Sequence, residues 1–97
     1  MKEEFTLKCC SYKIGTILDI SDSFDGNYKF ITIGNDPKDI YSQVRLVYSN
    51  ETLIVDCEYN EISVYDLYVG NRIVAYHSNV MTMSIPPQTN ALIIEVK

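Results

Sequence analysis

Short segments in which apolar and polar residues alternate restrict the fold of this chain more than any other feature. In IYSQVRLVY (40–48), Val44, Leu46 and Tyr48 occupy alternate positions. Successive side chains of a strand point to opposite faces, so this pattern predicts a half-buried strand. Six strand-like segments are present, at residues 12–20, 28–34, 40–48, 53–57, 71–77 and 91–96.

Turn-forming residues separate these segments and indicate the fold class. Asp25-Gly26 is typical of a tight hairpin turn between the first two segments, and Pro37 biases the residue before it away from helix. Short strands with turns at intervals of about 8–12 residues are typical of a β-sandwich or a small barrel. The sequence therefore predicts an all-β protein.

One short helical turn is expected near residues 63–70. Ser63 is followed three residues later by Asp66, so its hydroxyl can accept a hydrogen bond from a free backbone N–H while the carboxylate lies in the first turn. Gly70 suits the left-handed position that ends such a turn. We expect Leu67 and Val69 to pack inward.

The order of these elements is three strands, a short strand, a helical turn and two strands. This order resembles that of an OB-type barrel, in which a helical element closes one end. We expect a small antiparallel OB-like barrel of five to six strands, formed by residues 1–97 as a single domain with residues 1–11 as a lead-in. On the first strand, the residues expected on one face are Ile14, Thr16, Leu18 and Ile20.

Charge disfavours one large class of partners. The chain has 8 basic and 13 acidic residues and a net charge of −5. Nucleic-acid binding draws much of its affinity from lysine and arginine side chains that neutralise phosphates. We therefore expect no nucleic-acid partner.

The cellular compartment is inferred from the N-terminus and the cysteines. MKEEFTLKCC carries charges where a signal peptide needs an apolar core, and no apolar run is long enough to cross a membrane. The three cysteines have no disulfide-framework spacing, which favours free thiols. We expect a cytoplasmic protein without a membrane partner.

The sequence contains little that suggests catalysis. The single histidine, His77, would have to serve any Ser–His or Cys–His arrangement, and at a strand end it is typical of a hydrogen-bonded residue at a barrel rim. Paired carboxylates fall in turns, where solvated charge is normal, and no common metal-binding motif is present. We expect neither an enzyme nor a cofactor.

The segment MTMSIPPQTNA (81–91) is the least ordinary stretch. An apolar row that ends in a stiff proline pair can fill the barrel mouth, or it can meet a partner. Several of the chain's eight tyrosines cluster around the helical turn, and tyrosine suits protein and carbohydrate interfaces. The predicted binding surface comprises His77, Met81, Met83, Ile85, Pro86, Pro87, Gln88, Tyr65 and Tyr68.

Two stretches carry a family resemblance. SVYDLYVGNRIVAYH (63–77) is similar to a segment of small bacterial β-barrel domains. MTMSIPPQTNALII (81–94) resembles the M-T-x-S-I-P-P-Q-x-x-A segment of an uncharacterised domain family of Gram-positive bacteria, whose members often occur in larger exported proteins. The resemblance implies a β-barrel and brings no established activity.

The sequence supports two hypotheses about function. The first is a non-catalytic binding or interaction module with a protein or carbohydrate partner. The alternative is a soft-metal site of the Cu(I) type, because thioether and imidazole ligands from Met81, Met83 and His77 suit that ion.

Overall fold

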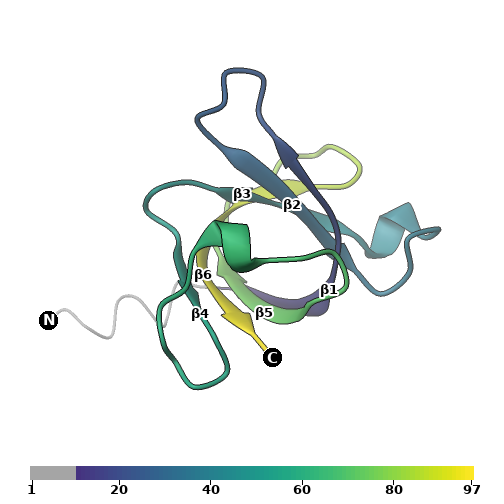
Figure 1. The fold of residues 1–97 in the computed structure, drawn as a ribbon. Coiled ribbons are helices and arrows are strands. Elements are labelled where there is room, and N and C mark those ends of the chain that lie inside the picture. Colours follow the sequence, from purple (N-terminus) through teal and green to yellow (C-terminus); the bar gives the residue numbers. More distant parts are fainter. Residues whose placement is uncertain (1–10) are drawn as a thin grey trace, which may run out of the picture.

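The chain folds into a closed β-barrel (Figure 1). The computed structural model describes residues 11–97, and nearly all of their regular structure is strand. The strands are β1 (Ser11–Asp22), β2 (Lys29–Gly34), β3 (Val44–Tyr48), β4 (Leu53–Val55), β5 (Arg72–His77) and β6 (Gln88–Val96). Two short 3-10 helices, η1 (Ile40–Ser42) and η2 (Val64–Asp66), complete the described elements. The prediction of an all-β barrel is confirmed.

The strand order has the OB-type arrangement, but the pairing is mixed. The order is β3-β2-β1-β5-β6-β4, and an additional β3–β6 pairing closes five of the strands into a ring. The β3–β6 and β4–β6 pairings are parallel, and the others are antiparallel. A closed ring with an odd number of strands cannot alternate direction all the way round, so at least one parallel pair is required. The expected purely antiparallel barrel is corrected on this point.

Several predicted boundaries move. The first part of the predicted strand 40–48 is helix η1, which begins where the Asp39 carboxylate accepts a hydrogen bond from the backbone N–H of Tyr41 at 3.2 Å. The last strand starts at Gln88 rather than at residue 91, because the chain already pairs with β3 there. Ser11, expected in the lead-in, belongs to β1, and the rest of that lead-in lies outside the described residues.

A β-bulge overturns the predicted face of β1. Ile17 pairs with Ile33 and Asp19 with Thr32, so Leu18 is an extra residue in β1. Before the bulge Ile17 faces the core, and after it Ile20 does. Not all of the other residues expected on that face point inward, since Ile14 is exposed. A bulge changes the side-chain period locally, which a strict period-two pattern does not represent.

Gly15 allows this strand to approach β2 closely. It is buried and faces inward with Ile17. A Cβ on Gly15 would lie 3.1 Å from the backbone nitrogen of Gly34. A larger residue at position 15 would force the backbones of β1 and β2 apart. The backbone of β2 therefore occupies the space that a side chain at position 15 would fill.

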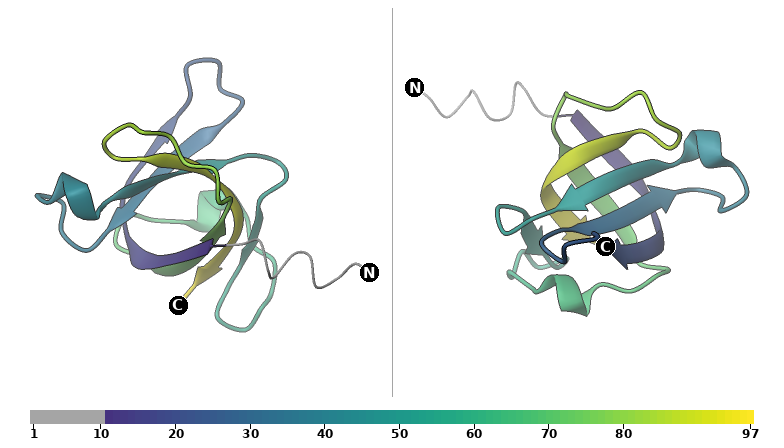
Figure 2. Two further views of the ribbon diagram at one scale, coloured as in Figure 1. Left: turned by 180° about the vertical axis from the view of Figure 1, so that it is seen from behind. Right: turned by 90° about the horizontal axis from the view of Figure 1, so that it is seen from above.

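Helix η2 closes one end of the barrel. It lies across the opening in Figure 1, where it is the green coil, and at the lower end of the barrel in the right panel of Figure 2. The predicted capping box is present: the Ser63 hydroxyl accepts a hydrogen bond from a backbone N–H of the helix, and the Asp66 carboxylate accepts one from the N–H of Ser63 at 3.0 Å. Leu67 is buried as expected, with Val64 beside it in the core, but Val69 is 62% exposed.

The inward face of Val69 was predicted wrongly because the helix ends at Asp66 and does not extend over the whole of residues 63–70. After Leu67 the chain is extended, and Tyr68–Asn71 forms a separate turn in which the N–H of Asn71 donates to the carbonyl of Tyr68 at 3.1 Å. Gly70 lies in this turn with φ +102°, which confirms the expected left-handed position.

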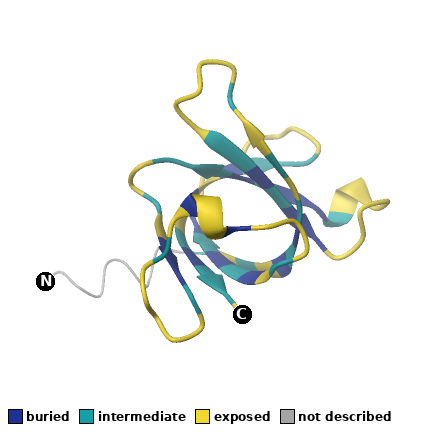
Figure 3. Cartoon of the chain, viewed as in Figure 1, coloured by how far each residue is buried: buried dark blue, intermediate teal, exposed yellow. Residues whose placement is uncertain are grey.

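The core fills the interior of the ring. Figure 3 shows that the buried residues lie mainly along the strands of the ring, whereas most of the loops are exposed. Alternation on β3 predicted its inward face correctly, since Val44 and Leu46 are buried. On β5, Ile73 and Ala75 are fully buried. The buried cluster consists of Ile17, Ile31, Ile33, Val44, Leu46, Ile54, Val64, Leu67, Ile73, Ala75, Ala91 and Ile94.

Candidate functional site

The predicted binding surface is divided between the two ends of the barrel. The β5–β6 loop, residues 78–87, lies at one end, and η2 lies at the other (Figure 2). Tyr65 is in η2 and Tyr68 follows it, so both lie away from the methionines. The Tyr65 ring contacts β2 instead, with the Lys29 ammonium 5.1 Å from its centroid. These tyrosines and the loop do not form one surface.

The β5–β6 loop is hydrogen-bonded to β6. The N–H of Ser78 donates to the carbonyl of Asn90 at 3.0 Å, and the N–H of Thr82 donates to the carbonyl of Gln88 at 2.9 Å. The Thr89 hydroxyl binds the carbonyl of Ser78 at 2.9 Å and that of Val80 at 2.7 Å. These bonds extend the β5–β6 hairpin beyond its strands, so the loop has a definite shape.

The apolar side chains of this loop do not fill the barrel. Met83 is 98% exposed, and Met81 and Ile85 are also exposed. Pro86 and Pro87 are half-buried, and the carbonyl of Pro87 accepts a hydrogen bond from the N–H of Arg45 at 2.8 Å. The prolines therefore fasten the loop to β3, and the interpretation of Met83 as a plug is wrong.

The three residues of the soft-metal hypothesis lie in different environments. His77 is buried on the inward face of β5, and its Nδ1 lies 2.8 Å from the carbonyl oxygen of Ser78. Met83 extends into solvent from the loop. The ligands of a single ion have to converge on one point, so the buried His77 and the exposed Met83 do not support the hypothesis.

A groove lies on the outer surface where β6 changes its neighbour. β6 first pairs with β3, through Gln88 to Asn90, and then with β4, from Ile93 onward. Between these pairings the chain leaves β3, passes through the turn at residues 49–52 and rejoins β6 as β4, again in the parallel direction. The groove has a volume of about 530 Å³, within the usual range of ligand sites of about 300–1,000 Å³.

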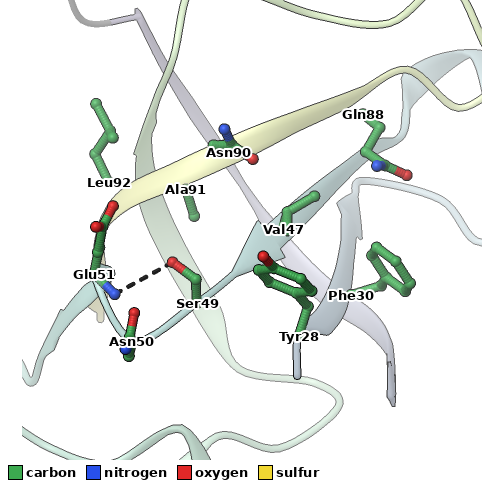
Figure 4. Close-up of a pocket in the computed structure, with 10 residues that line it drawn as sticks. All are labelled: Tyr28, Phe30, Val47, Ser49, Asn50, Glu51, Gln88, Asn90, Ala91 and Leu92. Carbon is green, nitrogen blue, oxygen red and sulfur yellow. Dashed lines mark hydrogen bonds between the residues drawn. The ribbon is translucent and has the colours of Figure 1, made fainter. Parts of the chain in front are cut away.

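Aromatic, amide and hydroxyl groups line this β3–β6 groove (Figure 4). Tyr28 directly precedes β2, Phe30 lies in β2, and Gln88 and Asn90 come from β6. Tyr28 is 46% exposed and Leu92 is 37% exposed, so both have free surface for a ligand. The residues that line the groove are Tyr28, Phe30, Val47, Ser49, Asn50, Glu51, Gln88, Asn90, Ala91 and Leu92.

The turn from Ser49 to Thr52 forms a fixed wall of the groove. The N–H of Thr52 donates to the carbonyl of Ser49 at 3.0 Å, and the N–H of Glu51 donates to the Ser49 hydroxyl at 3.2 Å. The Thr52 hydroxyl donates to the carbonyl of Ala91 on β6 at 2.9 Å. The wall is thus tied to the opposite side of the groove, and its shape exists before a ligand binds.

The charge around the groove is small and mixed. Glu51 contributes a carboxylate, and the described lining contains no lysine or arginine. Arg45 lies beside the groove on β3, with its guanidinium carbon 5.7 Å from the centroid of the Phe30 ring. This stacking occupies part of Phe30, so Tyr28 is the more accessible ring. The groove suits a neutral polar ligand better than a polyanion.

The β1–β2 hairpin holds Tyr28 in place. The N–H of Tyr28 donates to the Ser23 hydroxyl at 3.0 Å, and the carbonyl of Tyr28 accepts from the N–H of Ser23 at 2.9 Å. The Asp25 carboxylate accepts hydrogen bonds from the backbone N–H of Asn27 at 3.0 Å and from the Ser23 hydroxyl at 2.8 Å. The bond from the Asn27 N–H, followed by that from the hydroxyl, lowers the pKa of Asp25 below its ordinary value of 3.8.

Of the predicted site residues, only Gln88 lines the groove. Sequence reasoning missed Phe30, Glu51, Asn90 and Leu92 because they come from three separate parts of the chain. One signal was available: if Ile31 and Ile33 face the core, strand alternation places aromatic Tyr28 and Phe30 on the outer face.

Residues 11–97 lack the features of two further classes of site. This part of the chain has no group of three or more His, Cys, Asp or Glu side chains arranged to hold a metal ion. It also has no helix of the length and hydropathy needed to span a membrane.

The fold and the groove together define a closed mixed β-barrel with a candidate ligand site on its outer surface, where β2, β3 and β6 lie side by side. No protein-family model, curated protein sequence or solved structure matches the chain. The family resemblance expected from residues 63–77 and 81–94 therefore stays a prediction.

Proposed function

We propose that this protein is a non-catalytic carbohydrate-binding module and that the β3–β6 groove is its ligand site. The observation that carries the proposal is the composition of this groove on the face that OB-type barrels use for binding. An exposed tyrosine ring offers an apolar face for the C–H surface of a sugar. The amides of Gln88 and Asn90 supply donors and acceptors for its hydroxyl groups.

Charge favours this ligand class over nucleic acid. Proteins that bind single strands combine stacking rings with a positively charged groove. Here the described lining is aromatic but has one carboxylate and no basic side chain, and the whole chain has a net charge of −5. A neutral sugar has no phosphates to neutralise, so it does not need the missing basic groups.

The position of His77 supports the non-catalytic part of the proposal. Its ring is buried and its Nδ1 is directed at a backbone carbonyl. A general base has to reach the proton that it removes, directly or through one water. The only histidine of the chain is therefore poorly placed to act on a ligand in the outer groove.

Titration of the full chain with neutral oligosaccharides, followed by two-dimensional NMR, tests the proposal. Glucose and N-acetylglucosamine oligomers are suitable probes. We expect shifts for the amides of Ser49, Asn90 and Leu92. Tyr28→Ala should weaken binding about tenfold or more, since covering an apolar side chain is worth about 1.5–3 kcal/mol and 1.4 kcal/mol is a factor of ten.

Tyr41→Ala is the matched control. Tyr41 is 79% exposed on η1 and does not line the groove. Equal binding by the two variants would show that Tyr28 does not contact the sugar. Shifts confined to residues outside the groove would refute the proposed site.

A protein partner at the β5–β6 loop is the second candidate function. The observation that favours it is the exposure of apolar side chains on an ordered loop, with Val80 80% exposed and Met83 98% exposed. Pull-down from a lysate with the wild-type chain and with Met83→Ala tests this candidate. Loss of a captured protein in the variant, with the fold unchanged, is the expected result.

A further inference from the structure

A second, smaller hollow adjoins the β3–β6 groove. It has a volume of about 150 Å³ and shares Val47, Gln88 and Asn90 with the groove. Its additional walls include Val80 and Thr82 of the β5–β6 loop. Because three residues line both hollows, a ligand that fills the first is in contact with residues of the second.

The small hollow has a preformed wall. The N–H of Gln88 donates to the Thr82 hydroxyl at 2.9 Å, and the N–H of Thr82 donates to the carbonyl of Gln88 at 2.9 Å. The Thr89 hydroxyl donates a hydrogen bond to the carbonyl of Val80 at 2.7 Å. These contacts place an exposed apolar side chain and polar groups side by side, as in the larger groove.

The two hollows differ in what they can hold. A volume of about 150 Å³ is below the usual range of complete small-molecule sites, about 300–1,000 Å³. The smaller hollow is therefore suited to one part of a ligand rather than to a whole one. At the other end of the groove stands the Ser49–Thr52 wall, opposite Gln88 in Figure 4. A ligand longer than the groove can continue past Gln88 toward Val80.

We propose that the β3–β6 groove and the adjoining hollow are successive subsites for one linear neutral oligosaccharide, with Val80 and Thr82 forming the second subsite. This inference rests on the proposed carbohydrate-binding function. It adds that the ligand is a chain of sugars rather than a single sugar, and it assigns the β5–β6 loop a part in selecting chain length.

The test compares oligomers of one sugar series, from the monosaccharide to the pentasaccharide, on the full chain. Calorimetry or NMR titration gives the Kd for each length. We expect the affinity to rise about tenfold between a length that fills the groove and one that also reaches the loop, and then to level off. The amide signals of Val80 and Thr82 should shift only with the longer oligomers.

Val80→Ala isolates the second subsite. Val80 is 80% exposed, so the substitution leaves the fold intact. The loss of two methyl groups should weaken binding of the longer oligomers about threefold to tenfold and leave the shorter ones unchanged. Val69→Ala is the matched control, because Val69 is 62% exposed beyond η2 at the other end of the barrel.

The outcomes separate this inference from the function on which it rests. If short and long oligomers bind equally well in the groove, the second subsite is refuted and the carbohydrate site stands. If Val80→Ala weakens both lengths equally, the hollow is not a separate subsite. If no oligomer binds at any length, the proposed function fails together with this inference.

Discussion

The substitution Leu67→Ala tests whether the segment at η2 closes its end of the barrel. Leu67 is 5% exposed and packs in the core directly after η2. The substitution removes three carbon atoms, which at about 0.8 kcal/mol each gives about 2.4 kcal/mol. A residual cavity adds to this cost, so we expect the free energy of unfolding to fall by about 2–5 kcal/mol.

Equilibrium urea unfolding, followed by circular dichroism, measures this change. For a chain of 97 residues the slope of the free energy with urea is about 1–3 kcal/mol/M. The unfolding midpoint should therefore fall by about 1 M or more, with the slope unchanged. A thermal scan should show a decrease of about 10 °C or more.

Two exposed residues provide the comparison. Val69→Ala, two positions along the chain, should change the free energy of unfolding by less than about 0.5 kcal/mol, because Val69 is 62% exposed. Met83→Ala should be equally mild, because Met83 is 98% exposed. If Leu67→Ala proved no more destabilising than Val69→Ala, the assignment of η2 as the closure of its end of the barrel would be wrong. If Met83→Ala cost several kcal/mol, the exposed position of Met83 at the other end would be wrong.

Three further predictions concern single positions. Gly70→Ala should destabilise the protein by about 1 kcal/mol, because φ is +102° at this position. A Cβ there would meet no atom within 4 Å, so the cost comes from backbone strain alone. An unchanged melting temperature would contradict this. The pKa of Asp25 is lowered in the folded state, so the hydrogen bonds of its carboxylate stabilise the fold at pH values above the unfolded pKa. This stabilisation is lost as the pH falls through the folded pKa. An NMR titration of the Asp25 carboxyl with a midpoint at or above 3.8 would oppose this. Cys57 is an exposed free thiol and should be alkylated in the native protein without reductant. Resistance to alkylation would show that this thiol is covered or oxidised. The other two cysteines, Cys9 and Cys10, lie outside the described residues.

Local patterns predicted the parts of the fold that depend on local geometry. Alternation identified the inward face of β3, including Val44 and Leu46, because the two-residue period of a strand needs no distant partner. The capping box at Ser63 and Asp66 formed as expected, because both hydrogen bonds join groups within three residues of each other.

The same patterns were misleading wherever distant segments decide the outcome. The face of β1 depends on a bulge opposite β2, and the bulge exists because Ile17 and Ile20 both have to reach the core. The parallel β3–β6 pair follows from closing an odd number of strands, which is a property of the ring rather than of either strand. The position of Met83 depends on how the loop is fastened to β6.

The sequence alone determined that this is a small acidic all-β chain, because composition, charge and a two-residue period are carried by each segment independently. Only the tertiary structure decided where a ligand can bind. The β3–β6 groove combines Tyr28, Glu51 and Asn90, which lie far apart in the chain. They meet because β6 exchanges β3 for β4 as its neighbour, and that exchange is set by closure of the barrel.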